Sequence, residues 1–402
     1  MHPAITQELK FLQSGQSRRD FLRNCLLASG GLLVGLDRLS AFAPQQNGSS
    51  DPFRGGKQLG TVEFTNESRA PLDTVLGTGL DARLYSDLST LSFEHRITPG
   101  DKFYLRTSAS ELLNISKLWT IQVGGLAQKP ATVALEDLQK AAKPMGLHLM
   151  ECSGNTRATR FALLSVADWT GVPLNDLFAS RVKPRSSRVM VSGFDQYPGR
   201  SATSVPGADW VFTVEQLDTA KAFLALEMNG KPLTKDHGAP VRLLVPGWYG
   251  CTCIKWVNAI TFVEENVAAT SQMREFAART HQYGAPELAK DYRPAIIDQA
   301  AMPIRVEKWS VGGGIKYRVV GILWGGSRPI KSLEIRFNPE EDYARVDQFL
   351  QNTNDPWSLW WHAWSPKTPG TYLIRLRVGD PGIETKRLDS GHYVRSVDIE
   401  EV

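Results

Sequence analysis

From about residue 300 to the C-terminus, apolar and polar residues alternate in five short runs. The runs lie at 304–307, 316–324, 330–337, 357–364 and 370–378. Glycine-containing turns such as 312–314 and 325–327 separate them. This alternation is typical of strands with one buried face, and short strands at such spacing predict an antiparallel β-sandwich of the immunoglobulin-like type. Because 402 residues with 42% hydrophobic content exceed one ordinary domain, we expect a separate domain before it.

Charge and cysteine content exclude several classes of protein. Lys and Arg number 46 against 42 Asp and Glu, and the net charge of +4 is not gathered in basic blocks, so no nucleic-acid partner is predicted. The cysteines are Cys25, Cys152, Cys251 and Cys253. Their spacing predicts neither a metal finger nor a disulfide framework, and without a Cys-x-x-Cys-His motif we expect no covalent c-type haem in this chain.

Residues 1–43 have the pattern of a targeting segment. Arg18 and Arg19 precede an apolar run at 26–36, and a small-x-small site follows at 41–43, which resembles the twin-arginine export signal. A membrane anchor or a cytosolic helix is the alternative. The run is shorter than the roughly 20 residues that span a bilayer, so we expect export to the periplasm without stable membrane insertion. Residues 44–60 read as a polar linker.

The stretch around Cys152 predicts a functional site. Residues 147–150 read as a strand end and 153–155 as a turn, so the thiol lies where regular structure stops. Arg157 and Arg160 follow, and nearby cations favour the thiolate that binds metals. A buried structural cysteine is the alternative.

Two segments resemble the sulfite oxidase family of bacterial, exported molybdopterin-dependent oxidoreductases. They are Glu-Cys-Ser-Gly-Asn-Thr-Arg at 151–157 and about 34 residues at 223–256. The resemblance implies an α+β fold, with a mixed α/β molybdopterin-binding catalytic domain at 61–299 and an immunoglobulin-like domain at 300–402. It also implies one molybdenum–molybdopterin cofactor per chain, with Cys152 as the metal ligand, and a homodimer formed through 300–402. A free-standing sandwich without a partner is the alternative.

The resemblance also assigns site residues. Those implied to bind the cofactor are Tyr104, Arg106, Ser108, Cys152, Asp195, His237, Arg242, Cys253 and Lys255. The implied catalytic residues are Cys152, Arg106 and Arg157, and the two arginines would hold an anionic substrate. Arginine and lysine suit the phosphate that ends molybdopterin. The alternatives are a solvated arginine at 106, a turn aspartate at 195 and a histidine at 237 without a ligand role.

One position separates members of the family. Where the sulfite-oxidising members carry an active-site tyrosine, the best alignment places Phe276, although Tyr283 or Tyr292 could fill the place. The family commonly has Asn-His where this chain has Thr107 and Ser108. The departure at Phe276 bears on the substrate, and the departure at Thr107 and Ser108 bears on a cofactor contact that the family's histidine makes.

The resemblance implies oxygen-atom transfer at sulfur. The first candidate is oxidation of sulfite to sulfate, with electrons passed singly to an external cytochrome c. A sulfane-sulfur dehydrogenase subunit and a sulfoxide reductase are alternatives on the same scaffold. An exported binding or assembly module without catalytic activity is the alternative from another class.

Overall fold

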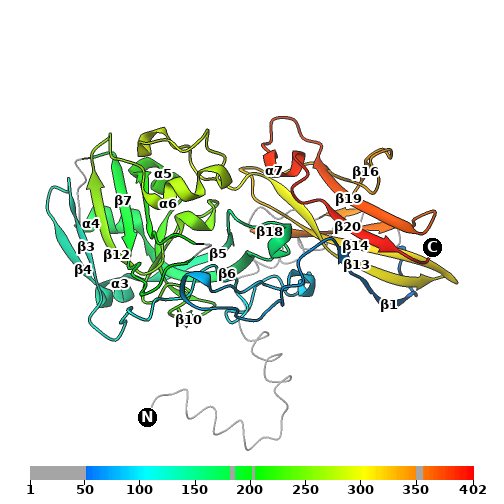
Figure 1. Cartoon of the computed structure of the whole chain (residues 1–402), viewed down its shortest axis with the longest axis horizontal. Coiled ribbons are helices and arrows are strands. Elements are labelled where there is room, and N and C mark those ends of the chain that lie inside the picture. Colours follow the sequence, from blue (N-terminus) through cyan, green and yellow to red (C-terminus); the bar gives the residue numbers. More distant parts are fainter. Residues whose placement is uncertain (1–50, 182–185, 202–203, 350–355) are drawn as a thin grey trace, which may run out of the picture. The chain divides into compact units, whose positions relative to one another are not determined.

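The computed structural model describes residues 51–181, 186–201, 204–349 and 356–402 (Figure 1). The predicted signal at 1–43 and the first part of the predicted linker lie outside the described residues. Pro52–Val402 forms one compact unit. Among the described residues, no helix is long and apolar enough to cross a membrane.

Two sheets contain the strands between residues 120 and 263. The first has the order β10-β9-β6-β5 with β11 beside β9, and every pairing in it is antiparallel. Its strands are β5 (Lys143–Glu151), β6 (Leu164–Pro173), β9 (Phe223–Met228), β10 (Lys231–Pro232) and β11 (Arg242–Leu244). Most residues of β6 and β9 are buried, which explains their nearly continuous apolar sequences.

The second sheet is mixed and carries the order β4-β3-β12-β7-β8. Its strands are β3 (Thr120–Gly125), β4 (Ala131–Ala134), β7 (Arg188–Gly193), β8 (Asp209–Thr213) and β12 (Val257–Val263). Strand β3 runs parallel to β12, and the other pairs are antiparallel. Short helices lie between the strands: α3 (Leu135–Ala141), α4 (Leu174–Arg181), α5 (Val214–Thr219) and α6 (Ser271–Phe276).

Two further five-stranded sheets hold the C-terminal region, and all of their pairings are antiparallel. One has the order β1 (Lys57–Val62), β13 (Ala300–Val311), β14 (Gly314–Trp324), β18 (Trp357–Trp364) and β17 (Gln348–Phe349). The other has the order β16 (Ala344–Arg345), β15 (Leu333–Arg336), β19 (Gly370–Val378), β20 (Arg395–Ile399) and β2 (Phe64–Thr65). The five predicted runs all contain strands, and the immunoglobulin-like type stays a prediction.

One local expectation differs from the structure. The linker predicted at 44–60 overlaps β1, which pairs with β13, and Phe53 is buried against Trp309 and Trp361. The polar composition of this segment gives no strand signal, because β1 lies at a sheet edge where backbone pairing is enough to form the strand.

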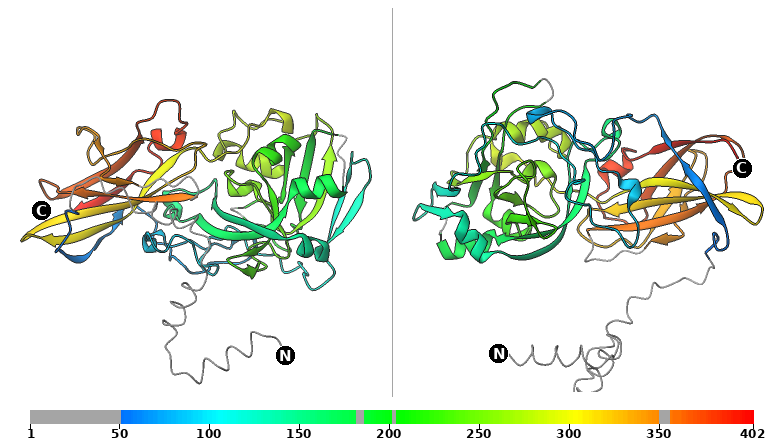
Figure 2. Two further views of the ribbon diagram at one scale, coloured as in Figure 1. Left: turned by 180° about the vertical axis from the view of Figure 1, so that it is seen from behind. Right: turned by 90° about the horizontal axis from the view of Figure 1, so that it is seen from below.

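The two pairs of sheets share one hydrophobic core, which includes Trp169 of β6 and Trp324 of β14. Figure 2 shows the same elements from behind and from below. Trp324 also donates from Nε1 to Glu151 at the end of β5. The domain boundary predicted between residues 299 and 300 stays a prediction. Trp324, which lies after this boundary, contacts Glu151, the residue before Cys152.

Candidate active site

Cys152 follows the last residue of β5 and is 5% exposed. Its backbone N–H donates to Leu163 O at 3.0 Å, and Gly154 N–H donates to its Sγ at 3.4 Å. Burial raises the pKa of the thiol, while Arg106, the Gly154 N–H and Arg279 oppose that shift. The thiol is therefore held at the predicted place, where a strand ends in a turn.

The cations beside this thiol are not the two that follow it in sequence. Arg157 begins a short 3₁₀ turn (η5, Arg157–Thr159), is exposed, and donates to Val394 O at 2.7 Å. Arg160 donates to Ala70 O at 3.0 Å. The expectation that these two stabilise the thiolate differs from the structure, because the chain turns their side chains away. The catalytic role of Arg157 stays a prediction.

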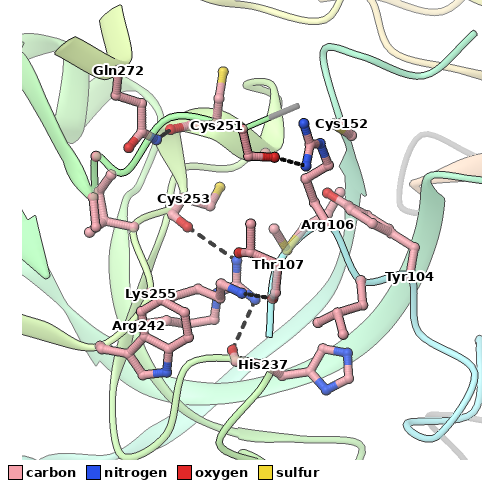
Figure 3. Close-up of a pocket in the computed structure, with 18 of the residues that line it drawn as sticks. Tyr104, Arg106, Thr107, Cys152, His237, Arg242, Cys251, Cys253, Lys255 and Gln272 are labelled. Atoms are coloured by element: carbon pink, nitrogen blue, oxygen red, sulfur yellow. Dashed lines mark hydrogen bonds between the residues drawn. The ribbon is translucent and has the colours of Figure 1, made fainter. Parts of the chain in front are cut away.

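A cavity of about 130 Å³, the deep cavity, lies beside Cys152 (Figure 3). Five loop segments and α6 line it, including Tyr104–Thr107, Asp236–His237 and Gly250–Trp256. Of the predicted cofactor residues, seven line it: Tyr104, Arg106, Cys152, His237, Arg242, Cys253 and Lys255.

Two buried cations dominate the deep cavity. Arg242 donates to His237 O at 3.0 Å and to Cys253 O at 3.1 Å, as Figure 3 shows, and its buried Nε has no partner. Lys255 donates to Thr107 O and Asp236 O. Burial and then Arg242 lower the pKa of Lys255 to about 7. Neither forms a salt bridge within the described residues, so the cavity favours an anion such as a phosphate.

His237 lines the deep cavity but uses both ring nitrogens within the protein. Its Nε2 lies 3.1 Å from Phe103 O, and its Nδ1 lies 2.8 Å from Thr234 Oγ1. Because a carbonyl only accepts, Nε2 carries the proton and Nδ1 accepts from the threonine. Burial lowers the pKa of His237 to about 4, so it is neutral. In this state it fixes the loop that carries Tyr104 and Arg106.

A glycine leaves room for the tyrosine at the edge of the deep cavity. A Cβ added to Gly250 would lie 2.5 Å from the Tyr104 hydroxyl oxygen. Burial, and next the nearby Cys152, raise the pKa of Tyr104 well above its usual value, so the hydroxyl keeps its proton. The phenol is therefore available as a hydrogen-bond donor close to Cys152.

Two predicted cofactor residues lie behind the lining. Ser108 accepts from Gly79 N–H at 2.7 Å, and Asp195 accepts from Gly207 N–H. Burial raises the pKa of Asp195. Neither side chain lines the deep cavity, although Gly207 does. Their cofactor roles stay predictions, and their observed contacts hold loop backbone.

A second cavity of about 540 Å³, the cationic cavity, is lined by Ser153 and Gly154 of the turn after Cys152. No carboxylate is among its described lining residues. The positively charged or titratable residues that line it are Arg83, Arg106, Arg279, His281, Lys386, Arg387 and His392. Arg106 lines both cavities. A Cβ at Gly154 would lie 3.7 Å from both Cys152 Sγ and Arg279 Nη1, so the two cavities meet at this thiol.

A buried ion pair ties the C-terminal region to the cationic cavity. Glu151 is fully buried and accepts from Tyr393 and Trp324, each at 2.9 Å. Arg387, at α7 (Lys386–Asp389), lies 3.5 Å from Glu151 and donates to Ser153 O and Arg279 O. Sequence reasoning missed Arg279 and Arg387, because no local motif links residues so far apart.

The structure places the three candidates for the family's active-site tyrosine position differently. Phe276 lines the deep cavity. Tyr283 is 77% exposed and lies under the Arg293 guanidinium, and Tyr292 is buried with an unpartnered hydroxyl. Neither tyrosine lines the two cavities. Within the described residues, no cluster of three or more His, Cys, Asp or Glu side chains could hold a metal.

Comparisons with known proteins agree with this arrangement. Residues 109–271 match the family described as "Oxidoreductase molybdopterin binding domain". The chain is 25% identical to mitochondrial sulfite oxidase of Homo sapiens over 324 residues, 75% of this chain and 58% of that protein. It is 28% identical to an NADPH nitrate reductase of Beauveria bassiana over 323 residues, 67% of this chain and 36% of that protein. The chain thus spans about one third to three fifths of the length of these two curated relatives.

A solved structure shares the fold. The sulfane dehydrogenase SoxCD from Paracoccus pantotrophus superposes with a TM-score of 0.59 over 90% of this chain and 95% of that chain. Its sequence identity to this chain is 18%. The likeness supports the sheet-rich architecture with few helices described above.

Proposed function

Because this chain belongs to the sulfite oxidase family of molybdopterin oxidoreductases, we propose that it oxidises a small anionic sulfur compound by oxygen-atom transfer, with sulfite as the first candidate. One observation carries the proposal. A cavity lined by arginine, lysine and histidine, with no described carboxylate in its lining, shares Arg106 with the deep cavity and includes Ser153 and Gly154 directly after Cys152. An anion is the ligand that such a cavity stabilises.

The residues of the deep cavity fit a molybdenum–molybdopterin cofactor. Arg242 and Lys255 are buried cations bonded only to carbonyl oxygens, and a phosphate would supply the missing negative charge. Cys152 would hold the metal as its one protein ligand, since soft thiolates select such metals and coordination deprotonates a thiol. When bound, the cofactor supplies the two-electron redox chemistry.

Three arginines would bind and orient the substrate. Arg106 and Arg279 lie on the two sides of the Cys152 turn, and Arg387 closes the cationic cavity from α7. Arg387 is fixed by Glu151 and by the carbonyl of Ser153, so its position depends on the backbone that carries the thiol. Charge-assisted contacts of this kind orient an oxyanion without covalent chemistry.

The electrons would pass singly to an external acceptor, for which we propose a periplasmic cytochrome c. The signal-like sequence at 1–43 supports export by the twin-arginine route. We further propose that residues 300–402 form an immunoglobulin-like domain through which two chains associate. The strands β13, β14, β18 and β19 are consistent with a sandwich of this kind.

A sulfane-sulfur dehydrogenase is the second candidate function. Phe276 lines the deep cavity and brings no hydroxyl there, unlike the tyrosine of the sulfite-oxidising members. The volume of the cationic cavity, about 540 Å³, leaves room for a substrate longer than sulfite. Both observations favour a sulfur compound with an additional sulfur atom.

The test is substrate-dependent reduction of a one-electron acceptor by the protein purified from its own host. Sulfite and thiosulfate are offered with oxidised cytochrome c, and a sulfoxide is offered with a reduced dye. Turnover with sulfite supports the first candidate, and turnover with thiosulfate alone replaces it with the second. Reduction of the sulfoxide alone would reverse the direction of the reaction. If the wild type turns over none of these compounds, and so behaves like Cys152→Ser, the result would favour a binding module.

A further inference from the structure

His281 lies in the cationic cavity and is held by a buried carboxylate that the proposed function does not use. Its Nε2 lies 3.2 Å from Asp298 Oδ1. The Asp298 side chain is 4% exposed, while the His281 side chain is 21% exposed and lines the cavity. The pair therefore has one buried end and one end that faces the cavity.

Asp298 also accepts hydrogen bonds from two further parts of the chain. It accepts from the Tyr249 hydroxyl at 3.4 Å and from the backbone N–H of Arg387 at 3.1 Å. Burial acts to raise the pKa of Asp298, but hydrogen bonds from His281 and from the Arg387 N–H hold it below its usual value. Burial raises the pKa of Tyr249, so its hydroxyl stays protonated. Asp298 is thus an ionised acceptor.

This arrangement fixes the tautomer of His281. With an ionised Asp298 facing Nε2, that nitrogen carries the ring proton, and the lone pair is on Nδ1. Nδ1 makes no hydrogen bond with any residue in the described part of the chain. The backbone of His281 has a φ of 60°, a left-handed conformation that is uncommon for residues other than glycine and is often found at functional sites.

We propose that His281 is the proton acceptor of the cationic cavity, taking up through Nδ1 one of the two protons that water loses when its oxygen is transferred to the sulfur substrate. The inference rests on the proposed function. For sulfite, the balance is sulfite plus water giving sulfate, two protons and two electrons. One S–O bond forms and both O–H bonds of water break. One proton goes to His281 and the other to solvent, and the electrons leave to the one-electron acceptor named above.

The groups around His281 shape its response to an anion. Asp298 and Tyr249 contact it, and Arg83, Arg106, Arg279, Lys386, Arg387 and His392 line the same cavity. The arginines and the lysine give the cavity a high positive charge while it lacks an anion. A bound oxyanion compensates those charges, so its arrival favours protonation of His281.

The first test measures proton uptake and does not depend on turnover. Inorganic sulfate is titrated into the oxidised holoenzyme near neutral pH in two buffers of different ionisation enthalpy. The wild type should take up a fraction of a proton per sulfate, and His281→Asn should lose that uptake. Asparagine suits the left-handed backbone, so the variant should keep the fold. His95→Asn, at an exposed site near Ser92, is the matched control and should keep the proton uptake of the wild type.

Three results would overturn the inference. The first is equal proton uptake by His281→Asn and the wild type. The second is loss of the uptake in His392→Asn with retention in His281→Asn. The third is failure of sulfate to bind, which would show that the cavity does not hold an oxyanion.

The second test is kinetic. In His281→Asn, kcat should fall by about a hundredfold or more, with a smaller change in KM, and the fall of kcat at acidic pH should flatten. Asp298→Asn should lower kcat less, because it removes the group that fixes the tautomer and leaves the base in place. An unchanged pH profile in His281→Asn would contradict the inference. Absence of sulfite turnover in the wild type would instead contradict the proposed function, and the sulfate titration would still test His281.

Discussion

Glu151, the residue before Cys152, lies with its Oε1 3.5 Å from Nη1 of Arg387 in the protein interior. This contact connects the end of β5 to α7, a short helix near the C-terminus. Because Arg387 also lines the cationic cavity, one buried pair controls both the backbone beside the thiol and a charge beside the substrate.

Glu151→Gln should lower the free energy of unfolding by about 3 kcal/mol or more, because it leaves the Arg387 charge buried without its partner. The amide keeps the size of the side chain, so the change isolates charge. Urea unfolding of both proteins measures it, with the exposed Glu264→Gln as the control. A loss equal to that of the control would show that the pair does not stabilise the fold.

Arg279→Gln should raise KM for the anionic sulfur substrate by about tenfold to a hundredfold, since a hydrogen bond to a charged group contributes about 1.5–3 kcal/mol. Steady-state kinetics with a one-electron acceptor provide the measurement. Arg345→Gln is a matched control at β16, where the guanidinium donates to Lys331 O. An unchanged KM in Arg279→Gln would remove this residue from the substrate site.

Arg157→Gln tests the role that the sequence motif implied. Its guanidinium donates to Val394 O at the surface, so we expect KM to change by less than about threefold, as for other exposed side chains. The same kinetic assay decides. A tenfold rise would mean that Arg157 reaches the substrate during turnover, in agreement with the resemblance.

The sequence predicted the five C-terminal runs that contain β13, β14, β15, β18 and β19, the end of β5 before Cys152, and part of the lining of the deep cavity. These strands could be predicted because alternation and turn residues act within a few positions of the chain. Tyr104, Arg106, Cys152, His237, Arg242, Cys253 and Lys255 line one cavity, as a shared cofactor site requires. These residues lie in motifs that can be recognised locally.

The lining of the cationic cavity could not be predicted in this way. Arg279, His281 and Arg387 approach Cys152 only because α7 packs beside the end of β5, and that approach depends on the shared core. The polar strand β1 was missed for a related reason, since its partner β13 lies far away in sequence. Spacing along the chain carries no signal for either contact.

Lys255 gives the cofactor-free protein a distinctive pH dependence. Its pKa is about 7 in the folded chain, whereas an unfolded lysine titrates near 10.4, so the unfolded state binds more protons between these values. Stability therefore rises with pH across this window, by up to about 1.4 kcal/mol per pH unit for this one group. In urea unfolding at pH 7, 8 and 9, the free energy of unfolding of the wild type should rise relative to that of Lys255→Met as the pH increases. A difference between the two proteins that stays constant with pH would contradict the lowered pKa.

Metal analysis of the purified mature protein tests the central claim most directly, namely that Cys152 holds a molybdenum cofactor between the two cavities. The wild type, exported from its own host, should contain about one molybdenum per chain together with released pterin fluorescence, as a single soft thiolate ligand implies. Cys152→Ser should lose the metal-centred activity while keeping its fold. A wild-type protein without molybdenum, or a fully active Cys152→Ser variant, would contradict the account.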